Sequence, residues 1–240
     1  SISKTFAAAA ILRLCEEQGD FLDESFRSLM PDAPVPVGIT VRQLLNHTGG
    51  LSDYFSTGDY QKAVLSHPDQ PWPYGKLMAT GLENTPLFAP GEGWSYSNPG
   101  YGLLKDLIGK KSGGNPFDYI QDRILSKLEL RDTRPFVTPD VDLELLEGEA
   151  PGFASDFRSS YHPEWIATGC LISTVADVAR FYDGLFAGKI ISDRSLREMT
   201  QTVDVLKSPP AASIPAYGLG LMHFRKDPLG DAYGHGGGGP

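Results

Sequence analysis

Hydrophobic residues recur every three to four positions in several stretches of the chain, which is the spacing of amphipathic helices. In the first stretch, residues 1–19, Phe6, Ile11 and Leu14 fall near one face, and Gly19 supplies a stop signal. Four consecutive alanines in this stretch leave room for neighbouring elements to approach closely. The pattern predicts one helix over residues 1–19, packed tightly against the rest of the molecule.

Capping residues predict where further helices begin. Thr40 with Gln43, and Thr174 with Asp177, have the spacing of a capping box, in which two side chains satisfy the free N–H groups of a helix start. Apolar residues follow each pair. Glycines 49 and 50 are expected to end the first of these two helices. Further helices are predicted over residues 98–109, 117–128 and from Ser192 to Met199.

Strand signals come late in the chain. Alternating apolar residues over 217–223, and again over 232–235, predict two strands. Helices and strands do not alternate as they do in a doubly wound parallel sheet. The sequence therefore predicts an α+β fold that is rich in helices and has an antiparallel sheet near its C-terminal end.

The charge balance excludes some partners. The 240 residues carry 21 basic and 30 acidic side chains, a net charge of −9, whereas nucleic acids and anionic membranes select basic surfaces. The longest apolar run, residues 6–12, is too short to span a bilayer. Cys15 and Cys170 form no metal-binding motif, and we expect no disulfide between them. The two cysteines therefore give no sign of a metal site.

Ser1 and Lys4 form the motif S-x-x-K at the start of the first predicted helix. Positions i and i+3 share a helix face, so the lysine amine lies beside the hydroxyl. A serine needs an adjacent base to become nucleophilic, and a lysine whose pKa is lowered can serve. Taken alone, the motif also fits a serine N-cap followed by a solvated lysine.

Two further short motifs can carry chemistry. Tyr96 and Asn98 form Y-x-N in a turn, where a phenol acidified by a nearby lysine can move protons and the amide can bind a lysine or a substrate carbonyl. His235 is followed by a glycine run that lets a substrate approach the backbone, whose N–H groups can stabilise an oxyanion. The structural alternatives are an Asn-capped aromatic turn and a flexible glycine turn.

Taken in order, these three motifs resemble the serine β-lactamase and penicillin-binding-protein superfamily. The resemblance is strongest to the branch with class C β-lactamases, D-Ala-D-Ala carboxypeptidases, D-amino-acid peptidases and family VIII carboxylesterases. The surrounding sequence resembles this branch along nearly the whole chain, in SISKTFAAAAILRL, ITVRQLLNHTGGLSDY, FAPGEGWSYSNPGYGLL, RILSKLELRDT, ATGCLISTVADVARF and YGLGLMHF.

The resemblance implies a serine hydrolase that works through an acyl-enzyme. Ser1 corresponds to the acylated nucleophile, Lys4 to its base, and Tyr96 to the group that passes the proton to the leaving group and later activates water. The family uses no metal or cofactor. Its substrates are small molecules or short peptides, namely esters, amides or D-amino-acid peptides, and many of its members are exported.

The same resemblance implies a substrate-binding set. Asn98 holds the lysine and the substrate, and His235 stands where many relatives have the lysine of K-T-G. The glycines that follow are Gly236, Gly237 and Gly238; the backbone N–H groups of Gly238 and Ser1 correspond to the oxyanion hole. Gly236 replaces the K-T-G hydroxyl that helps bind a substrate carboxylate in relatives. We therefore expect short esters to be better substrates than β-lactams.

The family has strands before the nucleophile and more strands and a helix after the last motif. The sequence thus resembles a fragment: one truncated β-lactamase-like domain over 1–240. Residues 1–19 and 166–240 are expected in an α/β subdomain, and residues 20–165 in a mainly helical one.

Two alternatives remain at this stage. An N-terminal-nucleophile hydrolase would use the α-amine of Ser1 as base, but that class is built on layered sheets, and the chain opens with an alanine-rich helix. A catalytically inactive binding module, or an inert fragment, on the same fold would also carry these residues.

Overall fold

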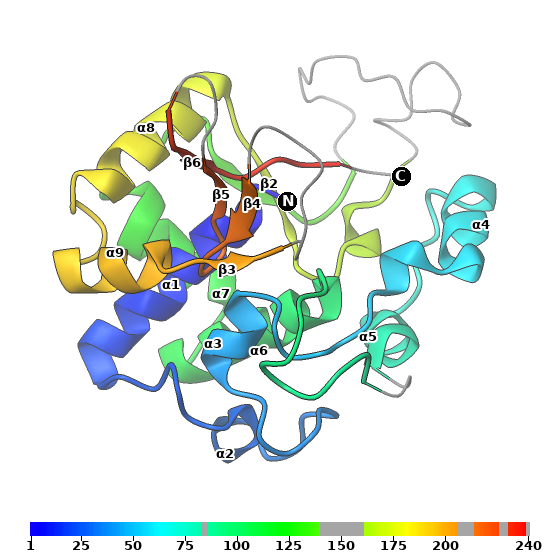
Figure 1. Ribbon diagram of the computed structural model, residues 1–240. Coiled ribbons are helices and arrows are strands. Elements are labelled where there is room, and N and C mark those ends of the chain that lie inside the picture. Colours follow the sequence, from blue (N-terminus) through cyan, green and yellow to red (C-terminus); the bar gives the residue numbers. More distant parts are fainter. Residues whose placement is uncertain (83–85, 140–160, 206–213, 226–229, 239–240) are drawn as a thin grey trace.

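The computed structural model describes residues 1–82, 86–139, 161–205, 214–225 and 230–238, and its fold is α+β (Figure 1). The described helices are α1 (Ser3–Gln18), α2 (Phe26–Leu29), α3 (Val41–Leu45), α4 (Gly58–Ser66), α5 (Tyr74–Leu82), α6 (Asn98–Ser112), α7 (Pro116–Ile120), α8 (Val175–Phe186) and α9 (Asp193–Thr200). Short 3₁₀ turns occur at Tyr54–Ser56 and Pro163–Trp165, and a π-helical turn follows α7 at Gln121–Leu125. None of the described helices is long and apolar enough to cross a membrane.

Helix α1 lies at the centre of the molecule, as its apolar pattern predicts. It packs against α6, α7 and α9, and its residues Ala8, Ala9 and Ala10 have no solvent exposure. Phe6 stacks on Phe181 of α8 with ring centroids 3.7 Å apart. Since alanine side chains are short, helices can approach α1 closely and hold its first turn in place.

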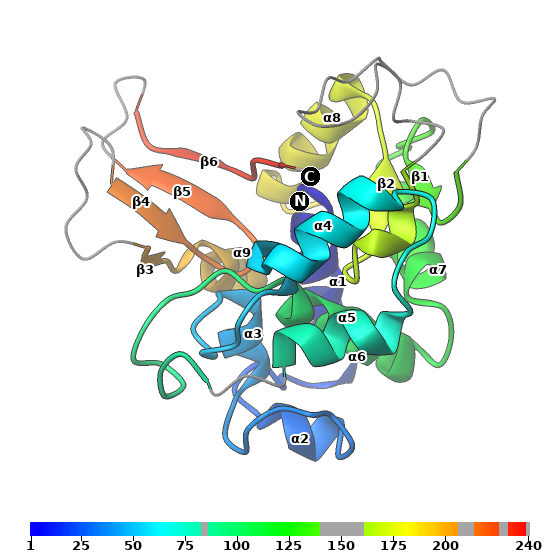
Figure 2. The ribbon, with the colours of Figure 1, turned by 90° about the vertical axis from the view of Figure 1, so that its right-hand side faces the viewer.

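Two antiparallel sheets accompany the helices. The larger has the order β3 (Val203–Asp204), β4 (Ile214–Tyr217), β5 (Met222–Arg225) and β6 (Ala232–Gly234); the smaller pairs β1 (Arg134–Phe136) with β2 (Cys170–Ile172). Figure 2 shows the larger sheet on one side of α1 and the β1–β2 pair on the other. The antiparallel prediction is therefore confirmed.

The connection between β4 and β5 fits against the first turns of α1. Thr5 Oγ1 donates to the Gly220 carbonyl at 2.7 Å. Gly220 has a φ of +67°, and a Cβ there would lie 2.6 Å from Cβ of Ala8, so only glycine fits. This contact sets the sheet beside the N-terminal end of α1.

The helix starts are largely as predicted. Thr40 and Gln43 form a complete capping box, and the side chains of Thr174 and Ser192 cap α8 and α9. The first helix begins at Ser3, two residues later than predicted, and ends before Gly19, whose φ is +100°. Both cysteines are free.

Three predictions about local structure are wrong. Helix α3 ends at Leu45, ahead of the glycines at 49 and 50. The segment predicted as one helix over 117–128 is α7 followed by the π-helical turn. The strand predicted over 217–223 is the hairpin between β4 and β5, because Gly220 takes a left-handed conformation that a strand cannot use.

Candidate active site

The first turn of α1 brings Ser1 and Lys4 together. The Lys4 backbone N–H donates to the Ser1 carbonyl at 2.9 Å, which closes the turn. The Lys4 side chain is 1% exposed, and its Nζ donates to Ser1 Oγ at 3.4 Å, whereas Ser1 itself is exposed. A reachable hydroxyl thus lies beside a buried amine, as the S-x-x-K spacing predicts.

Asn98 meets this pair from the N-terminal end of α6. Ser97 caps that helix by accepting from the Gly100 N–H, and Pro99 occupies its first turn. Asn98 Oδ1 accepts from Lys4 Nζ at 2.7 Å. On its other side, Asn98 Nδ2 donates to the Asp53 carboxylate at 3.0 and 3.3 Å. Ser1, Lys4, Asn98 and Asp53 therefore form one continuous row of polar groups.

The environment of Lys4 favours a neutral amine more than water does. Burial lowers its pKa from 10.5 to about 8, and the negative charge of Asp53 opposes part of that shift. Near pH 8, a sizeable fraction of the amine is unprotonated and can accept a proton from Ser1 Oγ. The Lys4 side chain therefore has the position and the proton affinity of a general base.

Tyr96 lies over Lys4, with Nζ 4.9 Å from the ring centroid. Its hydroxyl is buried and has no hydrogen bond of good geometry, although the nearby Ser1 hydroxyl lowers the pKa somewhat. Burial outweighs that effect and raises the pKa of Tyr96 well above its ordinary range. The structure does not show the acidified phenol that the Y-x-N motif would allow, and Tyr96 is protonated at neutral pH.

His235 is buried and neutral. Its Nδ1 contacts the Gly236 carbonyl at 2.5 Å, and since a carbonyl only accepts, Nδ1 carries the proton. Nε2 therefore accepts from the Tyr217 hydroxyl at 2.8 Å. Burial lowers the pKa of His235 from 6.5 to about 4, so this side chain is almost entirely neutral at pH 7.

The glycines after His235 run alongside Ser1. A Cβ at Gly237 would lie 3.1 Å from the Ser1 backbone nitrogen, which is tighter than ordinary contact. At Gly238 a Cβ would meet nothing within 4 Å, and Gly236 lies against the Met222 sulfur. Backbone without side chains therefore lies directly beside Ser1.

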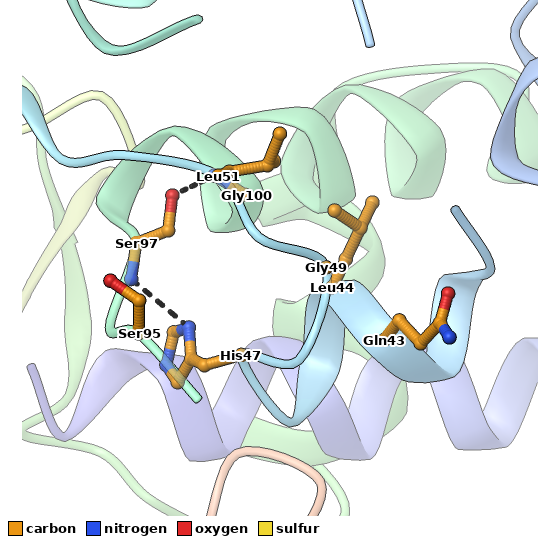
Figure 3. A pocket seen from close by; sticks show the side chains of 8 residues that line it. All are labelled: Gln43, Leu44, His47, Gly49, Leu51, Ser95, Ser97 and Gly100. Carbon is orange, nitrogen blue, oxygen red and sulfur yellow. Dashed lines mark hydrogen bonds between the residues drawn. The ribbon is translucent and has the colours of Figure 1, made fainter. Parts of the chain in front are cut away.

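His47 contacts the turn that carries Tyr96 and Ser97. It follows α3 with a φ of +63°, and its Nδ1 accepts from the Ser97 N–H at 3.2 Å. Its ring lies 4.3 Å from that of Tyr96 and 4.8 Å from that of Tyr217. Figure 3 shows this ring beside a cavity of about 10 Å³, which is too small for a substrate. His47 therefore orders the turn before α6 through its bond to the Ser97 N–H.

No group of three or more His, Cys, Asp or Glu side chains in the described ranges is arranged to hold a metal ion. The chemistry of the site is that of a hydroxyl, an amine, a phenol and backbone N–H groups. These are the parts of a nucleophilic acyl transfer.

Comparison with known proteins decides the family. The model of the family described as "Beta-lactamase" matches residues 1–240. The chain belongs to the beta-lactamase family. Among curated family relatives, penicillin-binding protein 4* of Bacillus subtilis is 29% identical over 260 residues, which cover 100% of this chain and 55% of that protein. The D-aminopeptidase of Brucella canis is 27% identical over 249 residues, covering 99% of this chain and 44% of that enzyme.

Solved structures of family members show the same architecture. A D-stereospecific amidohydrolase from Streptomyces sp. superposes with a TM-score of 0.88 at 32% identity, covering 99% of this chain and 74% of that one. The D-amino acid amidase from Ochrobactrum anthropi SV3 superposes with a TM-score of 0.80 at 26% identity, covering 98% and 69%. That amidase has also been solved with L-phenylalanine and with D-phenylalanine. The chain spans about half the length of the curated relatives it matches.

Of the site residues predicted from the sequence, some contact Ser1 or Lys4 directly and others lie close to them. Lys4 contacts Ser1 and Asn98 directly, Tyr96 covers Lys4, and the glycine run borders Ser1. The sequence reading missed Asp53 and Tyr217, which hold Asn98 and His235. No local motif marks either one, because each acts across a long sequence separation.

Proposed function

We propose that this protein is a serine hydrolase that cleaves amides and esters of D-amino acids through an acyl-enzyme at Ser1. The observation that carries this function is the row of hydrogen bonds from Ser1 Oγ through Lys4 Nζ to Asn98 Oδ1. Family membership supports the general class, which is that of the beta-lactamase hydrolases.

In the acylation step, neutral Lys4 takes the proton of Ser1 Oγ while that oxygen forms a bond to the substrate carbonyl carbon. Negative charge develops on the carbonyl oxygen, which the backbone N–H groups of Ser1 and Gly238 stabilise. The tetrahedral intermediate expels the leaving amine or alcohol, which takes a proton from Tyr96. The proton held by Lys4 then restores Tyr96.

In the deacylation step, water attacks the ester carbonyl of the acyl-enzyme. The neutral Lys4 amine beside Ser1 takes a proton from this water. The bond between the carbonyl carbon and Ser1 Oγ then breaks, Ser1 Oγ takes that proton back, and the free acid departs. Asn98 holds the Lys4 amine throughout, so the same groups serve both halves of the reaction. Burial of Lys4 supplies a base whose pKa of about 8 lies close to neutral pH.

The part of the substrate that departs as the amine or alcohol, here called the leaving side, is expected to be uncharged. A free C-terminal carboxylate or a β-lactam carboxylate requires a cation or a hydroxyl donor at the position after β6. This protein has neutral His235 there, followed by Gly236, which has no side chain. An amide or ester leaves no carboxylate to satisfy and is the better match.

The relatives support the D-amino-acid acyl side. Two structural relatives are named as a D-stereospecific amidohydrolase and a D-amino acid amidase, and a curated relative as a D-aminopeptidase. Because the amidase binds both D- and L-phenylalanine, an aromatic amino-acid amide is the first substrate to try.

The test is a panel of four substrates with the whole protein: D-phenylalanine amide, L-phenylalanine amide, the dipeptide D-Phe-D-Ala and a chromogenic cephalosporin. We expect kcat/KM to be highest for D-phenylalanine amide, and Ser1→Ala to abolish its turnover while Ser3→Ala retains it. Preference for the dipeptide or the cephalosporin would contradict the uncharged leaving side. Turnover that survives Ser1→Ala would contradict the serine mechanism.

A further inference from the structure

Asp53 is a partly buried carboxylate directly behind the Lys4–Asn98 pair, and neither the motifs nor the family roles given above involve it. It precedes the 3₁₀ turn Tyr54–Ser56, whose Phe55 N–H donates to Asp53 Oδ1 at 3.2 Å. Asn98 Nδ2 donates to Oδ2 at 3.0 Å and to Oδ1 at 3.3 Å. Both carboxylate oxygens thus accept from the amide that holds Lys4, and Oδ1 also accepts from the Phe55 N–H.

An asparagine amide has a donor end and an acceptor end, and either could face Lys4. An ionised carboxylate only accepts hydrogen bonds. With Asp53 on one side, the Asn98 NH₂ group must face Asp53, and its carbonyl oxygen must face the Lys4 amine. Reversing the amide would set NH₂ against the ammonium and oxygen against carboxylate, which is unfavourable at both ends.

Asp53 also acts on Lys4 through its charge. The carboxylate raises the pKa of Lys4 while burial lowers it, so Asp53 limits the downward shift. Burial raises the pKa of Asp53, and its hydrogen bonds and Lys4 oppose that rise. The other titratable groups that face Lys4 come from several elements: Ser1 beside it, Tyr96 and Tyr101 over it, Cys170 of β2, His47 after α3 and His235 after β6.

Within the acyl-enzyme function proposed above, we propose that Asp53 is a positioning residue: it fixes the Asn98 amide so that its oxygen holds Lys4, and its charge sets the pH at which Lys4 becomes a base. The hydrogen bonds of its carboxylate go to Asn98 and to the Phe55 N–H. Its effect on the reaction passes through Asn98 and Lys4.

The variant Asp53→Asn separates this role from mere support. Asparagine keeps the shape and can still accept from the Phe55 N–H, so the 3₁₀ turn keeps its cap. It removes the charge and places an NH₂ group opposite the Asn98 NH₂ group. Both changes disfavour the Lys4 ammonium, so the acidic limb of kcat/KM for D-phenylalanine amide should move to lower pH by about one unit or more.

A second variant, Asp53→Ser, tests whether the effect of Asp53→Asn comes from the asparagine side chain itself, since serine also caps well and carries no charge. We expect the limb to move in the same direction. The matched control is Asp69→Asn, which makes the same change of net charge at an exposed position and should leave the limb in place. Circular dichroism and thermal melting establish that each variant is folded before its pH profile is measured.

The possible outcomes separate the two proposals. Failure of the unmodified protein to form an acyl-enzyme at Ser1 would overturn the proposed function itself. If the unmodified protein acylates and both Asp53 variants lower the rate equally at every pH, with the limb unmoved, Asp53 has only a structural role and the inference is wrong. A shift of the limb to higher pH in both variants would equally contradict it.

Discussion

Lys4 Nζ donates to Asn98 Oδ1 at 2.7 Å, although 94 residues separate the two along the chain. This bond joins the first turn of α1 to the first residue of α6, and both residues are buried. It depends on the close packing of α1 against α6, which sets the position of the Lys4 amine.

The first prediction concerns pH. Burial lowers the pKa of Lys4 to about 8, and a base acts only when it is unprotonated. The rate of Ser1 acylation should therefore rise with pH and level off above pH 8. At pH values well below the pKa of Lys4, the rate should fall about tenfold for each pH unit, because the neutral fraction of a single amine falls by that factor. His235 has its pKa at about 4 and should add no second limb between pH 5 and 7. Stopped-flow acylation across pH 5 to 10 checks this, and a flat profile would exclude Lys4 as the base.

The second prediction concerns how the three catalytic groups combine. Ser1→Ala and Lys4→Ala should each abolish acylation, and Tyr96→Phe should lower the rate by about 10² to 10⁴, the range for a lost acid–base group. Groups that act as one unit are not additive, so the double variant Lys4→Ala/Tyr96→Phe should be hardly worse than Lys4→Ala. Single-turnover rates measure these effects. Full additivity would mean that Tyr96 works independently of Lys4.

The third prediction compares a glycine beside Ser1 with a glycine on an exposed helix face. Gly237→Ala would place a Cβ 3.1 Å from the Ser1 backbone nitrogen, so either the nucleophile or the glycine strand must shift. A displacement of about 1 Å at a reacting centre can cost about 10² in rate, and we expect a loss of that order. Gly75→Ala, on the exposed face of α5, also meets nothing within 4 Å and should leave the rate nearly unchanged. Equal losses in the two variants would contradict the close approach at Gly237.

The fourth prediction concerns substrate charge. His235→Lys introduces a cation beside the glycine run, where the present histidine is neutral and accepts from Tyr217. The ratio of kcat/KM for D-Phe-D-Ala to that for D-phenylalanine amide should rise by about tenfold, which corresponds to about 1.4 kcal/mol of selectivity. His235→Gln stays neutral and is the control. An unchanged ratio in His235→Lys would show that this position does not face the leaving side.

Much of the fold could be predicted from local patterns because the signals are strong and local. The helix starts at Thr40, Thr174 and Ser192 follow from hydroxyl side chains that bond to backbone N–H groups three residues on. The spacing of Ser1 and Lys4 places them on one turn, and the structure has them there. Such features depend on a few neighbouring residues and need no knowledge of the tertiary fold.

The failures come where tertiary contacts override the local pattern. Asp177 has the spacing of a capping box, but its carboxylate accepts from the Asp132 N–H and the Thr133 hydroxyl and pairs with Arg180. The apolar alternation over 217–223 is typical of a strand, yet a Cβ at Gly218 would lie 2.2 Å from the Met199 carbonyl oxygen, because the hairpin packs against the end of α9. Arg180 lies on the same helix as Asp177, but Asp132, Thr133 and Met199 lie outside the local sequence that each prediction used.

The candidate site shows the same division. Its motifs are short, and periodicity alone does not bring Asn98 to Lys4 or the glycine run to Ser1; the family resemblance implies those meetings. The roles of Asp53 and Tyr217 could not be predicted, because each contacts a motif residue through a long-range hydrogen bond. Such second partners follow from the packed structure, since burial of a polar group requires a partner that the sequence does not name.

The most direct test of the central claim is covalent labelling of Ser1. A fluorophosphonate reacts with an activated serine, and intact mass followed by peptide mapping locates the adduct. We predict one adduct per chain, located on Ser1, lost in Ser1→Ala, strongly slowed in Lys4→Ala and unaffected in Ser3→Ala, whose hydroxyl lies two residues away and contacts the Gly169 carbonyl. No adduct on the whole protein, or an adduct that persists in Ser1→Ala, would contradict the assignment of this chain as a serine hydrolase acting through Ser1.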